Sequence, residues 1–155
     1  MQASSSIPGA DPAVDAVALD LGVLLKHLMR STNRDFFHAL ERAGISFSQV
    51  KCLGLLADAE APLALGELAD ELGLSLPAVS RAVDGLVQRG EIKREEHLRD
   101  RRSKIVSVTP RGRRTFEDLM AVRLAGLRRM LAQLEPAELD ALGASVGPVV
   151  RRLGL

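Results

Sequence analysis

The sequence predicts a mainly α-helical fold with a small β-hairpin, an α+β class in which helices predominate. Through most of the 155 residues, apolar side chains recur at three- and four-residue steps, which is the spacing of one helix face. A turn at Gly73-Leu74-Ser75 separates two short helical stretches. After Gly90 the pattern changes to strand-like alternation.

The composition is that of an ordinary globular protein. Apolar residues make up 46% of the chain and charged residues 26%, which is enough to bury a core without disulfides or metals. The chain has no apolar run near the roughly 20 residues that span a bilayer, and residues 1–12 lack a secretory signal. We therefore expect a cytoplasmic protein with no membrane partner.

The N-terminal part of the chain predicts a tail followed by a long helix. Residues 1–11 carry no periodic pattern and are expected to form a flexible tail. A helix is expected over residues 12–43, with Pro12 suited to its first turn and Gly44 to its end. Its apolar stripe consists of Val14, Val17, Leu21, Leu24, Leu25, Leu28, Phe36 and Leu40. A helix this long with an apolar stripe requires a partner surface.

Shorter helices are expected next. Ser46 or Ser48 can cap a helix that ends near Glu60. Helices over Leu65–Leu72 and Leu76–Arg89 then flank the turn at Gly73, and Gly90 suits a left-handed cap. These two helices form a predicted helix-turn-helix.

A hairpin and two helices complete the predicted fold. Strands are expected over Glu91–Glu96 and Lys104–Val108, joined by a charged loop, or wing, that begins at His97. Thr109 is expected to cap a long helix, and a last helix begins near Pro136. The sequence therefore predicts a winged helix-turn-helix DNA-binding domain over residues 46–110. Residues 12–43 and 111–155 are predicted to form flanking helical regions.

Positive charge is concentrated in one segment of the chain. Between Ser75 and Arg114 there are eleven basic and five acidic residues, a net +6, so the remainder carries −5 within the total of +1. A basic segment in an otherwise acidic protein fits a polyanionic partner such as DNA, because the release of counterions favours binding. The alternative is a solvated charged surface.

The second helix of the predicted helix-turn-helix has a core face and an outer face. At about 100° per residue, the core face contains Leu76, Val79, Val83, Leu86 and Val87, and the outer face contains Pro77, Ala78, Arg81, Asp84, Gly85 and Gln88. Small residues let the backbone approach a major groove, where Arg reads guanine and Gln reads adenine. The alternative is an ordinary surface helix in which Asp84 pairs with a neighbouring arginine.

The wing carries three arginines within five positions. A hairpin tip does not require them, and arginine suits the negative potential of a narrow minor groove. Asp100 is expected to hold Arg102 in position while Arg99 and Arg101 contact phosphates. The alternative is a solvated turn.

The segment GELADELGLSLPAVSRAVDGLVQRGEIKREEHLRDRRSKIVSVTPRG, residues 66–112, resembles the winged helix-turn-helix core of the MarR family of transcription regulators. Its most specific part is Asp100-Arg101-Arg102-Ser103-Lys104 followed by Val108-Thr109 and Gly112. The resemblance implies a homodimeric regulator on a pseudo-palindromic double-stranded DNA operator, with Arg102 in the minor groove. It also implies that residues 12–43 and 111–155 form the helical dimerisation region. The expected DNA-binding residues are Ser75, Pro77, Ala78, Ser80, Arg81, Gln88, Arg99, Asp100, Arg101, Arg102 and Lys104.

The same resemblance implies repression that is relieved by a small lipophilic or aromatic effector. The expected effector contacts are His27, Arg30, Phe36 and Cys52, although residues of these types are more often packing residues than ligand contacts. Cys52 is also the basis of an alternative, a redox-responsive regulator. Another alternative is a winged-helix module that binds an acidic protein. We expect no enzyme activity, cofactor or metal site, because the sequence has no phosphate-binding glycine loop, ligand cluster or nucleophile motif.

Overall fold

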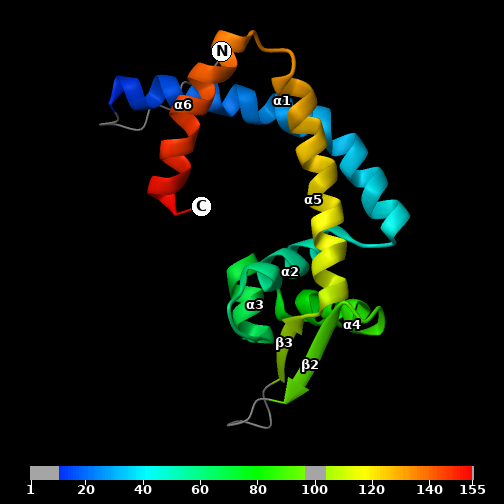
Figure 1. Ribbon diagram of the computed structural model, residues 1–155. Coiled ribbons are helices and arrows are strands. Elements are labelled where there is room, and N and C mark those ends of the chain that lie inside the picture. The colour runs from blue at the N-terminus through cyan, green and yellow to red at the C-terminus, as the bar shows by residue number, and fades with distance from the viewer. Residues whose placement is uncertain (1–10, 97–103, 155) are drawn as a thin grey trace, which may run out of the picture. The chain divides into compact units, whose positions relative to one another are not determined.

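The computed structural model describes residues 11–96 and 104–154 (Figure 1). The described residues contain six helices and three strands, in an order that confirms the predicted mainly helical fold with a hairpin. The elements are α1 (Pro12–Ala43), α2 (Phe47–Asp58), β1 (Leu63–Ala64), α3 (Leu65–Leu72), α4 (Leu76–Gln88), β2 (Ile92–Glu96), β3 (Lys104–Val108), α5 (Pro110–Leu131) and α6 (Pro136–Leu153).

The chain divides into two compact units. We call the unit formed by residues 35–125 the winged-helix unit, and the unit formed by residues 1–34 and 126–155 the terminal unit. Both divisions fall inside helices, at residue 34 in α1 and at residue 125 in α5. The predicted domain boundaries lay instead near the ends of these helices. The last turns of α1 and most of α5 therefore belong with the winged helix.

The winged-helix unit is built on one apolar core. Leu53 of α2, Leu68 of α3 and Leu86 of α4 have no exposed surface. Val106 of β3 is also fully buried, so the sheet contributes to the same core. The ring of Phe36, from α1, is 1% exposed and extends this core. Burial of these side chains supplies the main driving force for folding of the unit.

The turns between the short helices follow from single residues. Ser46 caps α2, because its hydroxyl accepts from the Gln49 amide while the Gln49 side chain accepts from the Ser46 amide. The sequence alone allowed either Ser46 or Ser48 as the N-cap of this helix. Gly73, with φ of 60°, and Gly90, with φ of 71°, adopt the left-handed conformation that ends α3 and follows α4.

The sheet has three strands, one more than predicted. The order is β1-β3-β2, and all pairs are antiparallel. In the hairpin Ile92 lies opposite Val108, and in β1 Leu63 lies opposite Val106. β1 contains two residues, which is too short for an alternating pattern to reveal it. Figure 1 shows β2 and β3 extending together from the cluster of α2, α3 and α4.

A close contact fixes the start of α5 against the beginning of β2. The Glu91 carbonyl accepts from the Thr109 amide at 3.0 Å. The Thr109 hydroxyl donates to the Gly90 carbonyl at 2.8 Å and accepts from the Gly112 amide at 3.1 Å. Gly112 lies so close that a Cβ atom there would collide with the Glu91 backbone. Thr109 therefore caps α5, as predicted, and Gly112 permits the approach.

The terminal unit exposes its apolar side chains. Leu19 is 71% exposed and Leu21 58% on α1, while Leu153 on α6 is 65% exposed. No residue of α6 is buried. Isolated helices with unburied apolar faces are marginal in water. The terminal unit consequently requires a further surface, as the long apolar stripe of α1 predicts.

Two predicted features of α4 need correction. Leu76, predicted on the core face of α4, is 52% exposed, because the first turn of that helix extends beyond the core. α4 ends at Gln88, one residue before the predicted end.

Within residues 11–96 and 104–154, no helix has the length and apolar character needed to cross a membrane.

We predict that Gly112→Ala destabilises the protein by about 1–3 kcal/mol, because the new methyl group meets backbone that must shift. Gly66→Ala is the matched control. A Cβ at Gly66, in α3, meets nothing within 4 Å, and helical alanine is favoured over glycine by up to about 1 kcal/mol. Urea unfolding at one protein concentration measures both changes. Equal stability of the two variants would show that the contact at Gly112 is unimportant.

Candidate nucleic-acid interface

The candidate interface begins with the outer face of α4. Arg81 and Gln88 are exposed, as are Ser75 and Pro77, whereas Ala78 and Ser80 are half-buried. Val79, Val83 and Leu86 on the opposite face are fully buried. The predicted outer face of this helix is therefore largely available to a partner.

Two features of this face leave polar groups available. The Ser75 side chain makes no capping hydrogen bond, although the Ser75 carbonyl accepts from the Val79 amide at 3.0 Å. Arg81 has no ion-pair partner among the described residues. An exposed, unpaired guanidinium can donate to a base edge or a phosphate.

Gly85 corrects the predicted outer face. It was predicted to point outward, but it lies against α2, where an added Cβ would collide with Nε2 of Gln49. The Gln49 side chain also completes the cap of α2. Helical periodicity gives the position of Gly85 around α4, but it cannot show that α2 approaches that side of the helix. Gly85 therefore serves helix packing.

Asp84 and Arg94 connect α4 to the hairpin. Their carboxylate and guanidinium are 2.7 Å apart, and the Arg94 side chain is 23% exposed. The pairing of Asp84 with an arginine, which the alternative of an ordinary surface helix included, is therefore present. The ion pair links the first strand of the wing to α4, so the two expected DNA-reading elements are joined directly.

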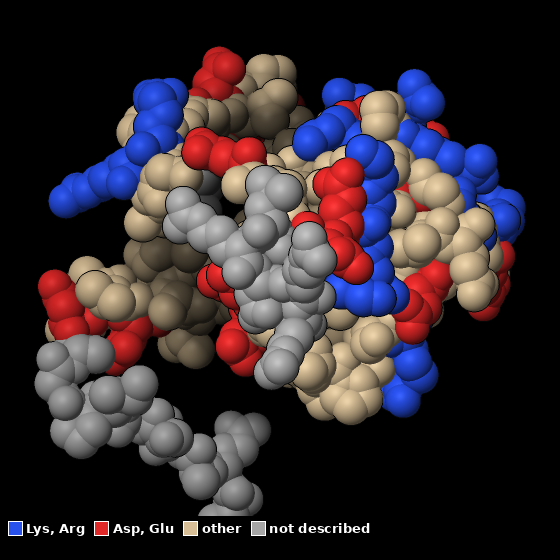
Figure 2. Space-filling model, turned by 90° about the horizontal axis from the view of Figure 1, so that it is seen from below, with Lys and Arg blue, Asp and Glu red and all other residues tan. Residues whose placement is uncertain are grey.

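The wing is described only at its base. Lys104 is exposed at the start of β3, opposite Glu96. The predicted wing contacts Arg99, Asp100, Arg101 and Arg102 lie outside the described residues. Among the described residues on the face shown in Figure 2, basic side chains lie next to acidic ones.

The predicted effector residues differ in their burial. Phe36 and Cys52 are buried in the core of the winged-helix unit, with 1% and 0% exposure. Arg123 stacks over the Phe36 ring with its guanidinium carbon 3.9 Å from the centroid. His27 and Arg30 are exposed residues of the terminal unit. Phe36 and Cys52 thus have the burial of packing residues, whereas His27 and Arg30 are accessible to solvent.

Burial also changes the chemistry of Cys52. It raises the pKa of the Cys52 thiol to about 11, an effect that the nearby Lys51 only partly opposes. The thiolate is the reactive form of cysteine. The structure therefore gives no support to the redox-responsive alternative. Within the described part of the chain, no three His, Cys, Asp or Glu side chains come together as a metal site.

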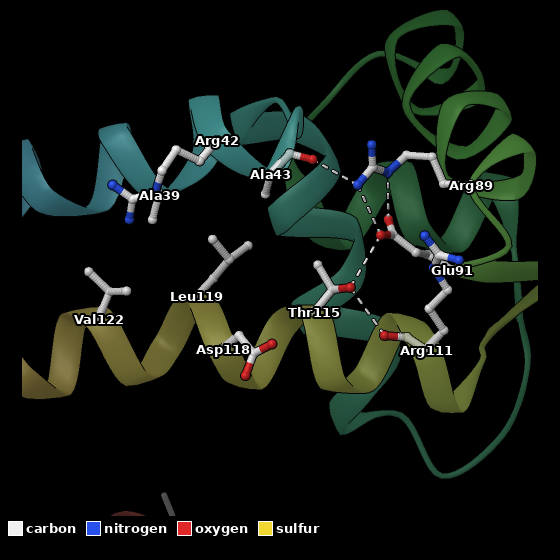
Figure 3. A pocket seen from close by; sticks show the side chains of 10 residues that line it. All are labelled: Ala39, Arg42, Ala43, Arg89, Glu91, Arg111, Thr115, Asp118, Leu119 and Val122. Atoms are coloured by element: carbon white, nitrogen blue, oxygen red, sulfur yellow. Dashed lines mark hydrogen bonds and ion pairs between the residues drawn. The ribbon is translucent and has the colours of Figure 1, made fainter.

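A cavity of about 390 Å³ in the winged-helix unit was not predicted from the sequence (Figure 3). We call it the arginine groove, and it is lined by Ala39, Arg42, Ala43, Arg89, Glu91, Arg111, Thr115, Asp118, Leu119 and Val122. These residues come from α1, the α4–β2 junction and α5, so no local motif unites them. The one sequence signal was Glu91, a charged residue next to the apolar start of β2.

The winged-helix segment matches a known family. A model of the MarR family matches residues 43–103. The chain is 24% identical over 143 residues to the transcriptional repressor YetL of Bacillus subtilis, covering 92% of this chain and 86% of the relative. It is 27% identical over 127 residues to the repressor MdtR of the same organism, covering 82% and 81%.

The fold likewise matches solved structures. The YusO protein from Bacillus subtilis superposes with a TM-score of 0.70 at 25% identity, covering 88% of this chain and 96% of that one. The similarity therefore extends beyond the winged helix to the long helices at both ends.

The burial of Cys52 generates a prediction about thiol chemistry. At pH 8 the native protein should react with a thiol reagent such as dithionitrobenzoate at least about tenfold more slowly than the urea-unfolded protein, because the buried thiol remains protonated. Absorbance of the released product measures both rates. Rapid stoichiometric reaction of the native protein would instead restore the redox-responsive alternative.

Proposed function

We propose that this chain, whose residues 43–103 match the MarR family of DNA-binding winged-helix regulators, is a homodimeric repressor that binds a pseudo-palindromic operator. The observation that carries the proposal is the exposed outer face of α4, with an unpaired Arg81, inside the segment that matches the family. Its curated relatives are named transcriptional repressors. A regulator of transcription must share a compartment with the DNA, so we also propose a cytoplasmic location. We further propose that the protein has no enzyme activity.

In this proposal α4 enters the major groove. Pro77 and Ala78 allow the backbone to approach closely, while Arg81 and Gln88 are long enough to reach base edges. Ser75 and Ser80 supply hydroxyls at the start of the helix for phosphate contacts. Since only Arg81 and Gln88 offer strong base-reading groups, DNA shape contributes to specificity.

The wing supplies the second set of proposed contacts. Arg99, Arg101 and Lys104 bind phosphates, and Arg102, oriented by Asp100, enters the minor groove. The ion pair between Asp84 and Arg94 supports this arrangement, because it keeps the base of the wing against α4.

The proposed homodimer is supported by the terminal unit. A groove of about 290 Å³ there is lined almost entirely by apolar side chains, contributed by α1, α5 and α6. Together with the exposed apolar residues of α1 and α6, it gives a surface that water solvates poorly. A second copy of the chain offers the same apolar surface, so each copy would cover the surface of the other, as in an isologous interface.

Relief of repression by a small effector completes the proposal. If an effector favours a conformation that binds DNA weakly, linkage requires the DNA to weaken effector binding by the same factor. Because Phe36 and Cys52 are buried in the core, His27 and Arg30 are the predicted effector residues that remain accessible to a ligand.

The experiment that tests the proposal is a titration of the protein's own upstream DNA at several salt concentrations. Binding to this DNA at 50 mM salt should weaken steeply as salt increases, because phosphate contacts release counterions. A random DNA of equal length should bind more weakly. Absence of binding at low salt, with capture of an acidic protein, would favour the protein-interaction alternative.

Arg81→Ala should weaken operator binding by roughly tenfold to a hundredfold, the cost of about 1–3 kcal/mol for a lost base or phosphate contact. Arg128→Ala removes the same charge from an exposed position of α5 in the terminal unit and is the control. Fluorescence anisotropy with labelled operator measures both affinities. Equal affinities would exclude the outer face of α4 from DNA recognition.

Leu21→Asp should convert the dimer to monomer, since it places a charge on the apolar stripe of α1 where a second copy packs. Gln133→Glu adds the same charge at an exposed polar position and should leave the dimer intact. Sedimentation equilibrium reports the mass of each species. A wild-type protein that sediments as a monomer would contradict the proposed homodimer.

A further inference from the structure

Arg89, at the end of α4, is joined by hydrogen bonds to α1, and none of the proposed DNA contacts uses this residue. We propose that Arg89 is a positioning residue for operator recognition. It holds the end of α1 against the end of α4 and so sets the half-site spacing, the distance between the centres of the two half-sites that a homodimer reads. The inference rests on the proposed function, because a spacing has meaning only for a homodimer on two half-sites.

Arg89 and Glu91 are fixed to α4 by their backbones. The Arg89 amide donates to the Gly85 carbonyl at 3.2 Å, and the Glu91 amide donates to the Leu86 carbonyl at 2.9 Å. The Leu86 side chain has no exposed surface, so this end of α4 is anchored in the core of the winged-helix unit. Any displacement of α4 therefore carries the side chains of Arg89 and Glu91 with it.

The Arg89 guanidinium binds the end of α1. Its Nη2 donates to the Ala43 carbonyl at 2.8 Å, and its Nη1 donates to the Gly44 carbonyl at 3.5 Å. The last carbonyls of a helix lack partners within the helix and carry the negative end of its dipole, so a cation that donates hydrogen bonds suits them. This contact joins the reading helix to α1 at a point where the α1 backbone requires a donor.

A buried carboxylate fixes the orientation of the same guanidinium. Glu91 is 1% exposed, and its carboxylate accepts from Nε of Arg89 at 3.1 Å and from Nη2 at 3.2 Å. The Thr115 hydroxyl of α5 donates to this carboxylate at 3.2 Å. Figure 3 shows these bonds linking α1, the end of α4 and α5. Because a guanidinium that binds a carboxylate through two nitrogens has a defined plane, Arg89 is aimed at the Ala43 carbonyl.

These polar bonds add a constraint that the apolar contacts of α1 do not supply. The ring of Phe36, which is 1% exposed, holds α1 on the core of the winged-helix unit. Apolar burial is non-directional, whereas a hydrogen bond weakens when its angle changes. Phe36 therefore keeps α1 attached to the core, and Arg89 fixes the direction of α1 relative to α4.

The direction of α1 matters because this helix leads to the proposed dimer. Both α1 and α5 continue from the winged-helix unit into the terminal unit, where the second copy is proposed to bind. A rigid connection between these helices and α4 presents the two copies of α4 at one separation, whereas a loose connection allows a range of separations. A rigid reader should therefore discriminate strongly between operators that differ in half-site spacing.

The test measures operator affinity as a function of half-site spacing. Labelled duplexes carry the operator from the protein's own upstream DNA, either unaltered or with one or two base pairs inserted at its centre. Each inserted base pair moves the half-sites apart by about 3.4 Å and rotates them by about 35°. Fluorescence anisotropy should show that the wild type binds the duplex with two inserted base pairs at least about tenfold more weakly than the unaltered one, because one α4 then loses its base contacts.

Arg89→Lys should flatten this dependence on spacing. Lysine keeps a positive charge beside Glu91 but lacks the planar fork that binds the carboxylate and the Ala43 carbonyl at the same time. In this variant two inserted base pairs should weaken binding by less than about threefold, because the heads can adjust to the longer spacing. The unaltered operator should bind up to about tenfold more weakly than it binds the wild type, since the heads are no longer held in the bound arrangement.

A second variant guards against misfolding caused by an unpaired charge. Arg89→Gln combined with Glu91→Gln removes both charges, so no buried charge is left without a partner. The shorter glutamine at position 89 cannot reproduce the two-sided contact of arginine. This double variant should show the same flattened dependence on spacing as Arg89→Lys.

Lys51→Met is the matched control. The Lys51 ammonium donates to the carbonyl of Leu72, the last residue of α3, at 2.9 Å, so it also binds the end of a helix. Both α2 and α3 lie entirely within the winged-helix unit, however. Loss of this bond should change the affinity for all duplexes by the same factor, so the ratio between spacings should remain that of the wild type.

The shape of the spacing profile distinguishes positioning from stability. A variant that is merely less stable loses affinity for every duplex equally, so profiles of both Arg89 variants parallel to that of the wild type would overturn the proposal. A wild type that binds all spacings equally, or a Lys51→Met variant with a flattened profile, would overturn it as well. Each of these results leaves the DNA-binding function intact. Absence of operator binding by the wild type would instead refute the proposed function.

Discussion

The buried carboxylate of Glu91 is the constraint on which the arrangement of the winged-helix unit depends. A charge that is 1% exposed is costly unless it is paired and hydrogen-bonded. Arg89 and Thr115 meet this requirement, and Arg89 in addition donates to the carbonyl of Ala43, the last residue of α1. The Glu91 backbone meanwhile accepts from Thr109, which caps α5. One residue therefore determines where α1, α4, β2 and α5 meet.

The sequence predicted most of this architecture because the local signals were strong. The bounds of α3 and of β3 were predicted to the residue, since Gly73 ends α3 and the change to strand-like alternation marks β3. The exposed Arg81 and Gln88 and the buried Val79 likewise follow from helical periodicity. Helical periodicity places side chains around one helix only, which is why it missed the approach of α2 to Gly85.

The effector residues illustrate the limit of such reasoning. Phe36 and Cys52 were chosen by type and by resemblance, yet both have the burial of ordinary core residues. The arginine groove instead combines residues from position 39 to position 122. Only the packing of α1 and α5 around the α4–β2 junction brings Arg42 and Arg111 to one cavity. A pocket assembled from distant segments leaves no periodic trace in the chain.

The two units divide the proposed work between them. The winged-helix unit has a packed core and the exposed outer face of α4, whereas α6 in the terminal unit buries none of its residues. This difference is expected if one unit is complete as a single chain and the other requires a second copy. A dimer then presents two α4 helices to DNA, so that the operator must contain two half-sites in a fixed spacing.

Footprinting of the purified protein on its own upstream DNA tests this account most directly. If a homodimer binds the operator, we expect two protected half-sites related by a dyad, with centres about 34 Å apart, one turn of DNA. Protection of a single half-site, or uniform coverage without sequence preference, would contradict it.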